Sequence, residues 1–574
     1  MREIVFVTPT DSKNILKESV GSLLLATILR SKGIESHILS FSAFGDPKDF
    51  SAFLEEGIRQ ICEKKPKIVS FYTRSDCYHI MLKMAEAVKA RLGCPVVFGG
   101  PHSDIIAQQT LVEIPYVDYI CRGEGETTVY PFFSSLLRGE PDLSVDGLVY
   151  RKDGEIIMNP RPKLIEDLDT IPMLDYSIFP EDAQADPRLA FPIDVGRGCP
   201  FGCTYCSTKT FWGRKYRLKS PARIVEELQY YHDLFGVHHF VFQHDMFTMN
   251  KKLVTEVCRL IKALPFKATW NCSARLDCID RELIDTMADA GLYHIYLGIE
   301  TGSPRMQKLI NKNLSLDGIT EGIAYLLSKN LQVTTSFIYG FPEETEEEVS
   351  QTFALVMDLI RLGGVRVQMH RCAFLPGTAL FEEYKDRLSP AVGYSDMTGG
   401  VGVEECRDLL QEHPALFAYF NEYTTELRTK LLHFPVFLDT VLAMRSVYLY
   451  LGDKYPREKL IRMYFDFVEK NRAVLEQDDL SQEEMARLIQ QGDLYAQSFR
   501  GDPREAMIAD AYRLRQAKLA VSCGQLPVAT EITCVSPLEL DRGIPLTQCK
   551  EGWYMSTYQP DEKKGSVKVQ VRHT

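Results

Sequence analysis

The segment Val195-Gly-Arg-Gly-Cys-Pro-Phe-Gly-Cys-Thr-Tyr-Cys206 places three thiols at a C-x-x-x-C-x-x-C spacing, at Cys199, Cys203 and Cys206. Thiols this close form a disulfide staple, a zinc site or an iron–sulfur cradle. A zinc site usually takes a fourth ligand and C-x-x-C pairs, and a disulfide is unusual in a long chain without a secretory signal. Three cysteines on one loop can instead hold three irons of a 4Fe–4S cluster and leave the fourth open. The spacing favours such a cluster.

Length and composition predict a multidomain protein of the ordinary globular kind. A chain of 574 residues is too long for one core, and 45% hydrophobic with 25% charged residues is typical of soluble proteins. The net charge of −12 argues against a nucleic-acid partner. No apolar run is long enough to cross a bilayer, and fifteen cysteines without an export signal indicate a reducing compartment. We therefore expect a cytoplasmic protein with no membrane partner.

The first domain, residues 1–145, alternates β-rich runs with amphipathic helical stretches. Helical patterns at 20–32 and 80–91 end at Gly33 and Gly93, as helices often do. Strands that alternate with helices predict an α/β fold with a flavodoxin-like, doubly wound parallel sheet. The expected strands are 3–8, 35–39, 67–72, 95–98 and 119–121.

The rest of the chain divides into three further parts. Residues 146–190 are expected to be a linker that holds a polar hairpin with an Asp153-Gly154 turn. Residues 191–390 contain six strand–helix units, which predict an open, partial (β/α)6 barrel whose strand ends converge on one cavity. Residues 400–574 are expected to be mainly helical, with helices at 434–451, 457–474 and 481–500 and a short β tail. This last domain would cap the barrel and select the substrate.

The cysteine loop, with Tyr205 before its last cysteine, resembles the cluster motif of the radical S-adenosylmethionine (SAM) superfamily. The resemblance implies that Cys199, Cys203 and Cys206 hold the cluster and that the open iron chelates the amino and carboxylate groups of SAM. It further implies reductive release of methionine and a 5′-deoxyadenosyl radical, which takes hydrogen from a substrate. Tyr205 would present its backbone to the adenine.

Further SAM contacts follow from the same resemblance, at the ends of later strands. Glu300 would offer a polar group to the nucleoside or methionine, and Arg275 would pair with the methionine carboxylate. For both residues a structural ion pair inside the barrel is the alternative. Tyr339 and Gly340, in Phe337-Ile-Tyr-Gly-Phe-Pro, match the fifth-strand motif that approaches adenine.

His244 and Asp245 are the only candidates for catalytic side chains. The resembling families often carry two acids at this strand end, whereas this chain has His244-Asp245. Asp245 is also a candidate SAM contact. A packing or hydrogen-bonding histidine is at least as good an interpretation of His244 as a proton donor.

Two glycine-rich strand ends in the first domain carry a second resemblance. Val96-Val-Phe-Gly-Gly-Pro-His-Ser103 and Cys121-Arg-Gly-Glu-Gly-Glu126, followed by the cysteine loop, look like the cobalamin-binding radical SAM class. Glycines at strand ends let the backbone approach a bulky ligand. The residues expected to contact cobalamin are Thr73, Arg74, Gly99, Gly100, Pro101, His102, Gly123, Glu124, Gly125 and Glu126.

The loop after the first strand lacks the Asp-x-His-x-x-Gly motif, whose histidine binds cobalt in cobalamin mutases and methionine synthase. It reads Thr8-Pro-Thr-Asp-Ser-Lys-Asn14. We expect no protein histidine beneath the cobalt. Arg74 would lie there, and a guanidinium has no lone pair to donate. His102 is expected to be a turn histidine rather than a cobalt ligand, and an unligated lower face favours methyl transfer.

The leading functional hypothesis is a cobalamin-dependent radical SAM C-methyltransferase that acts on an unactivated carbon. An enzyme with the same cofactors but without net methylation, for example a cyclase, a ring-contracting enzyme or an oxidase, is the alternative. A cobalamin- or cluster-based sensor is the second alternative. The expected partners are a small-molecule or peptide substrate and an electron donor such as flavodoxin or ferredoxin.

Overall fold

The computed structural model describes residues 3–10, 20–47, 49–179, 186–390, 401–431, 434, 458–475, 529–534, 553–561 and 566–573. The chain forms two compact units. The first contains Met1–Glu300, Pro304–Ile338 and Gly364–Thr424. The second contains Thr301–Ser303, Tyr339–Gly363 and Thr425–Thr574.

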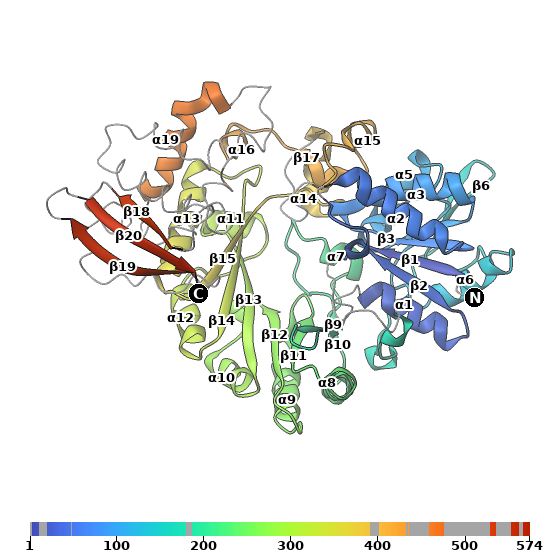
Figure 1. Cartoon of the computed structure of the whole chain (residues 1–574), viewed down its shortest axis with the longest axis horizontal. Helices are drawn as coiled ribbons and strands as arrows, with labels where there is room; N and C mark the ends of the chain where they lie inside the picture. Colours follow the sequence, from blue (N-terminus) through green and yellow to red (C-terminus); the bar gives the residue numbers. More distant parts are fainter. Residues whose placement is uncertain are drawn as a thin grey trace. The chain divides into compact units, whose positions relative to one another are not determined.

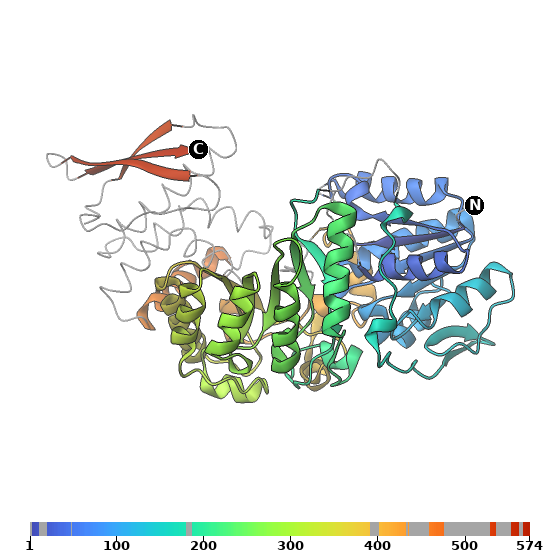
Figure 2. The same cartoon turned by 90° about the horizontal axis from the view of Figure 1, so that it is seen from below.

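The first unit begins with a seven-stranded sheet whose first five strands are parallel, in the order β2-β1-β3-β4-β5. All five predicted strands are confirmed to within one or two residues, and so is the doubly wound fold, with helices on both faces of the sheet (Figures 1 and 2). Every residue of β1 is buried, as expected of a covered parallel sheet. The strands are β1 (Ile4–Thr8), β2 (Ser36–Ser40), β3 (Ile68–Tyr72), β4 (Val96–Gly99) and β5 (Tyr119–Cys121).

Four main helices cover this sheet. One pair packs together as α1 with α6, and the other as α2 with α3. Gly93 ends α3 with a φ of 65°, a left-handed conformation that glycine adopts without steric cost. The helices are α1 (Val20–Ser31), α2 (Phe50–Glu63), α3 (Tyr78–Leu92) and α6 (Val129–Leu137).

The predicted hairpin belongs to this sheet rather than to a linker. Its strands, β6 (Leu148–Lys152) and β7 (Glu155–Met158), continue the sheet beyond β5 in antiparallel pairing, with Ile120 opposite Val149. Pairing of this kind covers the open edge that β5 would otherwise present. The expected domain boundary at residue 145 is therefore too early, and the sheet ends at Met158.

The following segment is also ordered against its surroundings. It contains two short 3-10 turns, η4 (Leu168–Thr170) and η5 (Tyr176–Ile178), and buries Leu168 and Tyr176. The backbone N–H of Asp175 donates to Thr27 in α1, and that of Leu174 donates to Tyr231 in the barrel. The linker is thus a packed strap between the two parts of the first unit.

The second sheet confirms the partial barrel. Its six strands follow the order β15-β14-β13-β12-β11-β8, and the pairing is parallel from β14 through to β8 (Figure 1). Ser220 caps the first barrel helix, α8 (Pro221–Phe235), through a bond from the N–H of Arg223. The strands are β8 (Phe191–Asp194), β11 (His239–Gln243), β12 (Thr269–Ala274), β13 (Leu292–Glu300), β14 (Gln332–Tyr339) and β15 (Val365–Arg371).

Residues 401–424 were expected in the C-terminal domain, but they pack onto the first one. Leu416, Phe417 and Phe420 are buried in the same core as Phe71 and Tyr78 of the N-terminal sheet and its helix. The Phe417 and Tyr78 ring centroids lie 5.9 Å apart. The segment includes α15 (Arg407–Glu412). The apolar side chains of this segment are more stable when removed from water, and the surface that covers them belongs to α3, which is far away in sequence.

The second unit contains α13 (Glu346–Arg361), α16 (Glu426–Lys430) and α19 (Glu458–Leu475). The capping box predicted by Thr345-x-x-Glu348 is present at the start of α13. The helix expected at 457–474 is confirmed as α19, whereas those at 434–451 and 481–500 lie outside the described residues, apart from Phe434. The β tail is an antiparallel sheet of β18 (Ala529–Cys534), β20 (Ser566–His573) and β19 (Trp553–Asp561). Among the described helices, none has the length and apolarity of a membrane span.

Candidate active site

The cysteine loop runs from β9 (Gly196–Arg197) to the short helix α7 (Thr208–Trp212). All three cysteines are partly buried. The backbone of Thr204 anchors the loop, since its N–H donates to Ile310 and its carbonyl accepts from Leu380, each at 2.9 Å. Burial raises the pKa of Cys199 and of Cys203, and for Cys203 the nearby Lys312 ammonium opposes that rise.

No three His, Cys, Asp or Glu side chains among the described residues converge as ligands of one metal ion. A 4Fe–4S cluster does not need such convergence, because each cysteine binds a different iron. The three thiols of the loop lie near one another, since the charges of Cys203 and Cys206 both act to raise the pKa of Cys199, and this suits that kind of ligation.

Arg275, at the end of β12, lies directly against this loop. Its guanidinium carbon is 3.9 Å from the centroid of the Phe201 ring. Asp277 accepts two hydrogen bonds from it, at 3.0 and 2.8 Å, and the Lys312 carbonyl accepts a third at 2.9 Å. The side chain is only 6% exposed, and its Nη1 is buried without a hydrogen-bond partner. The predicted SAM contact therefore has one nitrogen, with two N–H donors, left for a ligand.

Glu300 and Tyr205 form a second polar group near the loop. Glu300 has a φ of 69°, which is strained for a residue with a side chain. Its carboxylate pairs with Lys312 at 3.0 Å. Burial, and then the Glu300 charge and hydrogen bond, raise the pKa of Tyr205. Tyr205 therefore stays protonated and Glu300 is held in a fixed position.

His244 and Asp245 point to different surroundings. His244 is 8% exposed and lies against the Tyr216 ring at 5.1 Å. Its Nδ1 accepts from the N–H of Met246, and burial lowers its pKa to about 4, so the ring is neutral. Asp245 accepts from Thr208 at 3.3 Å, and desolvation raises its pKa. Asp245 is thus beside the cysteine loop, and His244 is a packed side chain.

Tyr339 and Gly340 belong to the second unit. Tyr339 is buried, with its ring 5.0 Å from that of Phe434. Gly340 has a φ of 78°, donates its N–H to Glu344 at 2.5 Å and accepts from Arg428 through its carbonyl. Burial raises the pKa of Glu344 to about 8. The turn is therefore held from both sides by side chains.

The strand ends of the first sheet form a tight turn around Thr73 and Gly100. The Thr73 hydroxyl donates to the Gly99 carbonyl at 2.9 Å and bonds Ser103 at 2.8 Å. Gly100 has a φ of 101°, and a Cβ there would lie 2.7 Å from the Thr73 carbonyl oxygen. Only glycine fits this position, so the turn presents backbone rather than side chain.

His102 uses both ring nitrogens inside the protein. Nδ1 bonds the Ser75 hydroxyl at 2.8 Å and Nε2 bonds the Leu416 carbonyl at 2.9 Å. A carbonyl can only accept, so Nε2 carries the proton. Burial lowers the His102 pKa to about 4. Arg74 lies nearby, half-exposed and paired with Asp76 at 2.9 Å.

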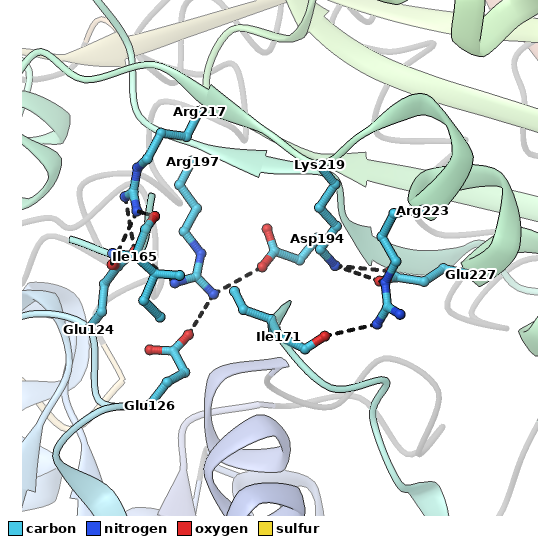
Figure 3. A network of polar contacts seen from close by, with 10 residues as sticks. All are labelled: Glu124, Glu126, Ile165, Ile171, Asp194, Arg197, Arg217, Lys219, Arg223 and Glu227. Carbon is cyan, nitrogen blue, oxygen red and sulfur yellow. Dashed lines mark hydrogen bonds and ion pairs between the residues drawn. The ribbon is translucent and has the colours of Figure 1, made fainter. Parts of the chain in front are cut away.

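Glu124 and Glu126 turn away from the expected cobalamin surface. The Glu124 side chain is 1% exposed and pairs with Arg197 and Arg217 at 2.8 and 2.9 Å. Glu126 pairs with Arg197 at 2.6 Å (Figure 3). Gly123, with a φ of 78°, donates its N–H to the Asp104 carboxylate, and the Gly125 carbonyl accepts from the N–H groups of Thr128 and Val129.

A cavity of about 330 Å³ joins the two halves of the candidate site within the first unit. The first-domain side of its lining includes Pro101 and His102. Its barrel side includes Tyr205 from the cysteine loop and His370 at the end of β15. The cavity thus opens between the predicted cobalamin turn and the predicted cluster loop.

Several residues of this site were missed in the sequence. The Lys312 ammonium pairs with Glu300, and the Lys312 carbonyl accepts from Arg275. Ser75 and Leu416 hold His102 in place through hydrogen bonds. His370 lines the cavity. The sequence held one signal for Lys312, because an asparagine stands on each side of it. Asn311 and Asn313 both have φ near 50°, a left-handed conformation that asparagine adopts more readily than most residues. The contacts to Leu416 carry no local signal.

Comparisons with known proteins agree with this arrangement. The radical SAM superfamily profile matches residues 193–356 and the B12 binding domain profile matches 17–131. The chain is 32% identical over 391 residues to the uncharacterized methyltransferase PH0819 of Pyrococcus horikoshii, covering 67% of this chain and 83% of that protein. It is 31% identical to the anaerobic magnesium-protoporphyrin IX monomethyl ester cyclase of Cereibacter sphaeroides, over 46% of this chain and 44% of the cyclase.

The fold is also that of a solved structure. The cobalamin-dependent SAM radical enzyme OxsB, with aqua-cobalamin and SAM bound, matches 91% of this chain and 81% of its own, with a TM-score of 0.57 and 13% identity. The chain belongs to the cobalamin-binding class of radical SAM enzymes. The cofactors of this class are a 4Fe–4S cluster, SAM and cobalamin.

The residues present fit these cofactors. The orphaned Nη1 of Arg275 suits a carboxylate such as that of SAM, because a guanidinium matches carboxylate geometry. The Gly100 turn suits a ligand at the ends of the strands, because Pro101 and His102, which follow it directly, line the cavity.

Proposed function

We propose that this enzyme transfers a methyl group from SAM to an unactivated carbon of a substrate bound in the cavity. The observation that carries the proposal is the shared lining of this cavity by Pro101 and His102 on one side and Tyr205 on the other. Groups bound at both places would face the same substrate. Similarity to a methyltransferase over most of its length supports the same activity.

When bound, the cluster supplies the electron that cleaves SAM, and cobalamin supplies a carrier for the methyl group. The protein's residues bind and orient these partners. Cys199, Cys203 and Cys206 would hold three irons, and Arg275 would fix the SAM carboxylate. Glu300, held by Lys312 at 3.0 Å, would orient the ligand beside Tyr205. His102 is neutral and bonded on both nitrogens within the protein, so it would have no free lone pair for a metal ion.

The decisive experiment uses SAM with a deuteriated methyl group. The purified enzyme, loaded with cluster and cobalamin, is incubated with candidate substrates in the presence of a strong reductant. The masses of the products are then measured by mass spectrometry. A product heavier by one deuteriomethyl group supports the proposal. A new product without this label, formed only with SAM, contradicts it and supports non-methylating chemistry.

The second candidate is such non-methylating chemistry with the same cofactors. The similarity to the cyclase of Cereibacter sphaeroides favours it, because that similarity includes 46% of this chain. The residues that line the cavity are equally compatible with methylating and with non-methylating chemistry. The sensor hypothesis predicts no turnover of SAM at all.

We also propose that a small acidic protein such as flavodoxin or ferredoxin supplies the electron in a reducing, cytoplasmic compartment. Lys209 and Arg214 are exposed beside the cysteine loop, and the Arg214 guanidinium lies against Gly202. Opposite charges steer such encounters. Reduction of the cluster by a flavodoxin, slowed in a K209E/R214E variant, tests this part; an unchanged rate contradicts it.

A further inference from the structure

The contact between the cobalamin-binding domain and the barrel is made by a buried network of charges. Arg197 and Arg217 stand opposite each other in the antiparallel pair β9 and β10 (Arg217–Leu218). Two like charges at such positions repel. Both side chains point toward the loop that carries Glu124 and Glu126, and these carboxylates meet them (Figure 3).

Glu124 is at the centre of this network. Its Oε1 lies 2.8 Å from Arg197 and 2.9 Å from Arg217, and its Oε2 is 3.1 Å from Arg217. The N–H of Ile165 also donates to Oε2, at 2.5 Å. The carboxylate thus accepts from two arginines and one amide while 1% exposed. Its lone pairs are used within the protein.

Arg197 is the residue that ties the network to the cluster loop. It pairs with Glu124, with Glu126 at 2.6 Å and with Asp194 at 3.2 Å, and its side chain is 8% exposed. Cys199 follows two residues later. Separating the partners of a buried ion pair leaves an uncompensated charge inside the protein, which is strongly unfavourable. The pair therefore holds its residues in a fixed geometry.

The far end of the cluster loop is held by the same two arginines. Trp212, the last residue of α7, lies with its ring 5.5 Å from the Arg197 guanidinium and 5.6 Å from that of Arg217. A guanidinium near an aromatic face is attracted to it. The entrance and the exit of the loop therefore rest on one pair of guanidiniums, and Glu124 holds that pair.

A second buried cluster lies close by but stays within the barrel and its strap. Lys219 and Arg223 both pair with Glu227 at 2.8 Å, and Arg223 donates to the Ile171 carbonyl (Figure 3). Glu227 has a 4% exposed side chain. It resembles Glu124 in burial and in the number of its cationic partners, but both of these partners belong to the barrel.

We propose that Glu124, Glu126 and Arg197 are positioning residues that fix the cluster loop, and hence SAM, against the cobalamin-binding domain. This inference rests on the proposed function. In it, the Arg-Gly-Glu-Gly-Glu segment gives its two carboxylates to the barrel. Transfer of the SAM methyl group to reduced cobalamin depends on this link, because donor and acceptor are held by different domains. Reductive cleavage of SAM needs only the barrel, where the bonds of the Thr204 backbone to Ile310 and Leu380 still anchor the cluster loop.

The test compares E124Q with E227Q in the enzyme loaded with cluster and cobalamin. Titanium(III) citrate supplies the electrons, and SAM is the only added substrate. Methyl donation to the electron pair of cob(I)alamin leaves S-adenosylhomocysteine. One-electron cleavage leaves methionine and the 5′-deoxyadenosyl radical, which takes a hydrogen atom from a buffer component to become 5′-deoxyadenosine. We expect E124Q to form S-adenosylhomocysteine at least tenfold more slowly and 5′-deoxyadenosine within about twofold of wild type. In E227Q the ratio of the two products should equal that of wild type.

Hydrogen exchange gives a readout that does not depend on turnover. In E124Q, exchange should rise in both 194–218 and 122–126, whereas in E227Q it should stay unchanged in 122–126. The variant R197K, which keeps the charge but loses the planar fork, should fall between E124Q and wild type. A product ratio and an exchange pattern in E124Q equal to those of E227Q overturn the inference. A wild-type enzyme that forms no S-adenosylhomocysteine overturns the proposed function instead.

Discussion

The carboxyl ends of the parallel strands in the two sheets differ in whether their polar side chains are already bonded within the protein. At the N-terminal sheet, the polar side chains are bonded within the protein: Thr73 to Ser103, His102 to Ser75 and Leu416. At the barrel sheet, Arg275 keeps a buried donor without a partner.

This difference suits the two expected ligands. A large cofactor that stays bound needs a shaped surface, which the Gly100 turn gives through its backbone. A cosubstrate that is consumed in each cycle needs specific charged contacts that form and break, which Arg275 can give. Variants that disturb one edge should therefore leave the other intact.

The largest effect is expected at the cysteine loop. C203S should lose the cluster, with iron content and SAM cleavage both falling by at least about 100-fold, because a cluster iron loses its thiolate. Iron analysis and paramagnetic resonance of the reduced protein measure this. Cobalamin content should stay at the wild-type level if the two edges are independent.

Cys278 is the matched control. It is partly buried like the loop cysteines, and its surroundings include the charge of Cys199. C278S should keep its cluster and its response to SAM. Loss of iron in C278S would show a fourth cysteine ligand and contradict an open iron.

The next effect is expected at Arg275. R275Q should bind SAM about 10- to 100-fold more weakly, because a charge-assisted hydrogen bond contributes about 1.5–3 kcal/mol. Equilibrium dialysis with labelled SAM, on protein of known cluster content, measures it. The control is R281Q. The Arg281 guanidinium lies over the Tyr325 ring, 4.8 Å from its centroid, and this pair is not part of the cysteine loop. Equal affinity in R275Q and wild type would make Arg275 purely structural.

The N-terminal edge should respond to acid. Burial holds the pKa of His79 and of His102 at about 4, below the ordinary 6.5, and both rings bond carbonyls of 401–424. Their contribution is complete above pH 6.5 and is lost as the pH falls toward 4. Each should remove on the order of 2 kcal/mol from the free energy of unfolding between about pH 7 and pH 5.

Denaturant unfolding at a series of pH values measures this loss. H102Q can still donate to the Leu416 carbonyl but does not titrate, so its stability should fall less steeply with acid. H239Q, at an exposed histidine, should follow wild type. An identical slope in H102Q and wild type contradicts the assignment.

The smallest effect is expected at Gly100. G100A should lose about 2 kcal/mol of stability and part of its cobalamin, because the new methyl group meets the Thr73 backbone. G45A is matched in φ, which is 101° at both positions, but its Cβ meets nothing within 4 Å. It should lose about 1 kcal/mol and keep its cobalamin. Equal cobalamin content in G100A and wild type would separate this turn from cofactor binding.

Much of the fold was predictable because its signals are local. The strands at 3–8 and 119–121, the glycine that ends α3 and the capping box at Thr345 depend on residues a few positions apart. The hairpin pairing and the packing of 401–424 were not, because each depends on which distant surface is left uncovered.

The sequence by itself determined the cofactor class: the spacing of Cys199, Cys203 and Cys206 and the glycines of two strand ends are demands of the backbone and of metal ligation. Only the tertiary structure decided what the neighbouring side chains do. Glu124, 73 residues before Arg197, turns to the barrel because two buried guanidiniums need its charge. His102 is neutral because burial lowers its pKa, and part of its surroundings comes from Leu416, 314 residues later, whose carbonyl accepts from its Nε2. Charges and hydrogen bonds are satisfied by proximity in space, which local sequence does not encode.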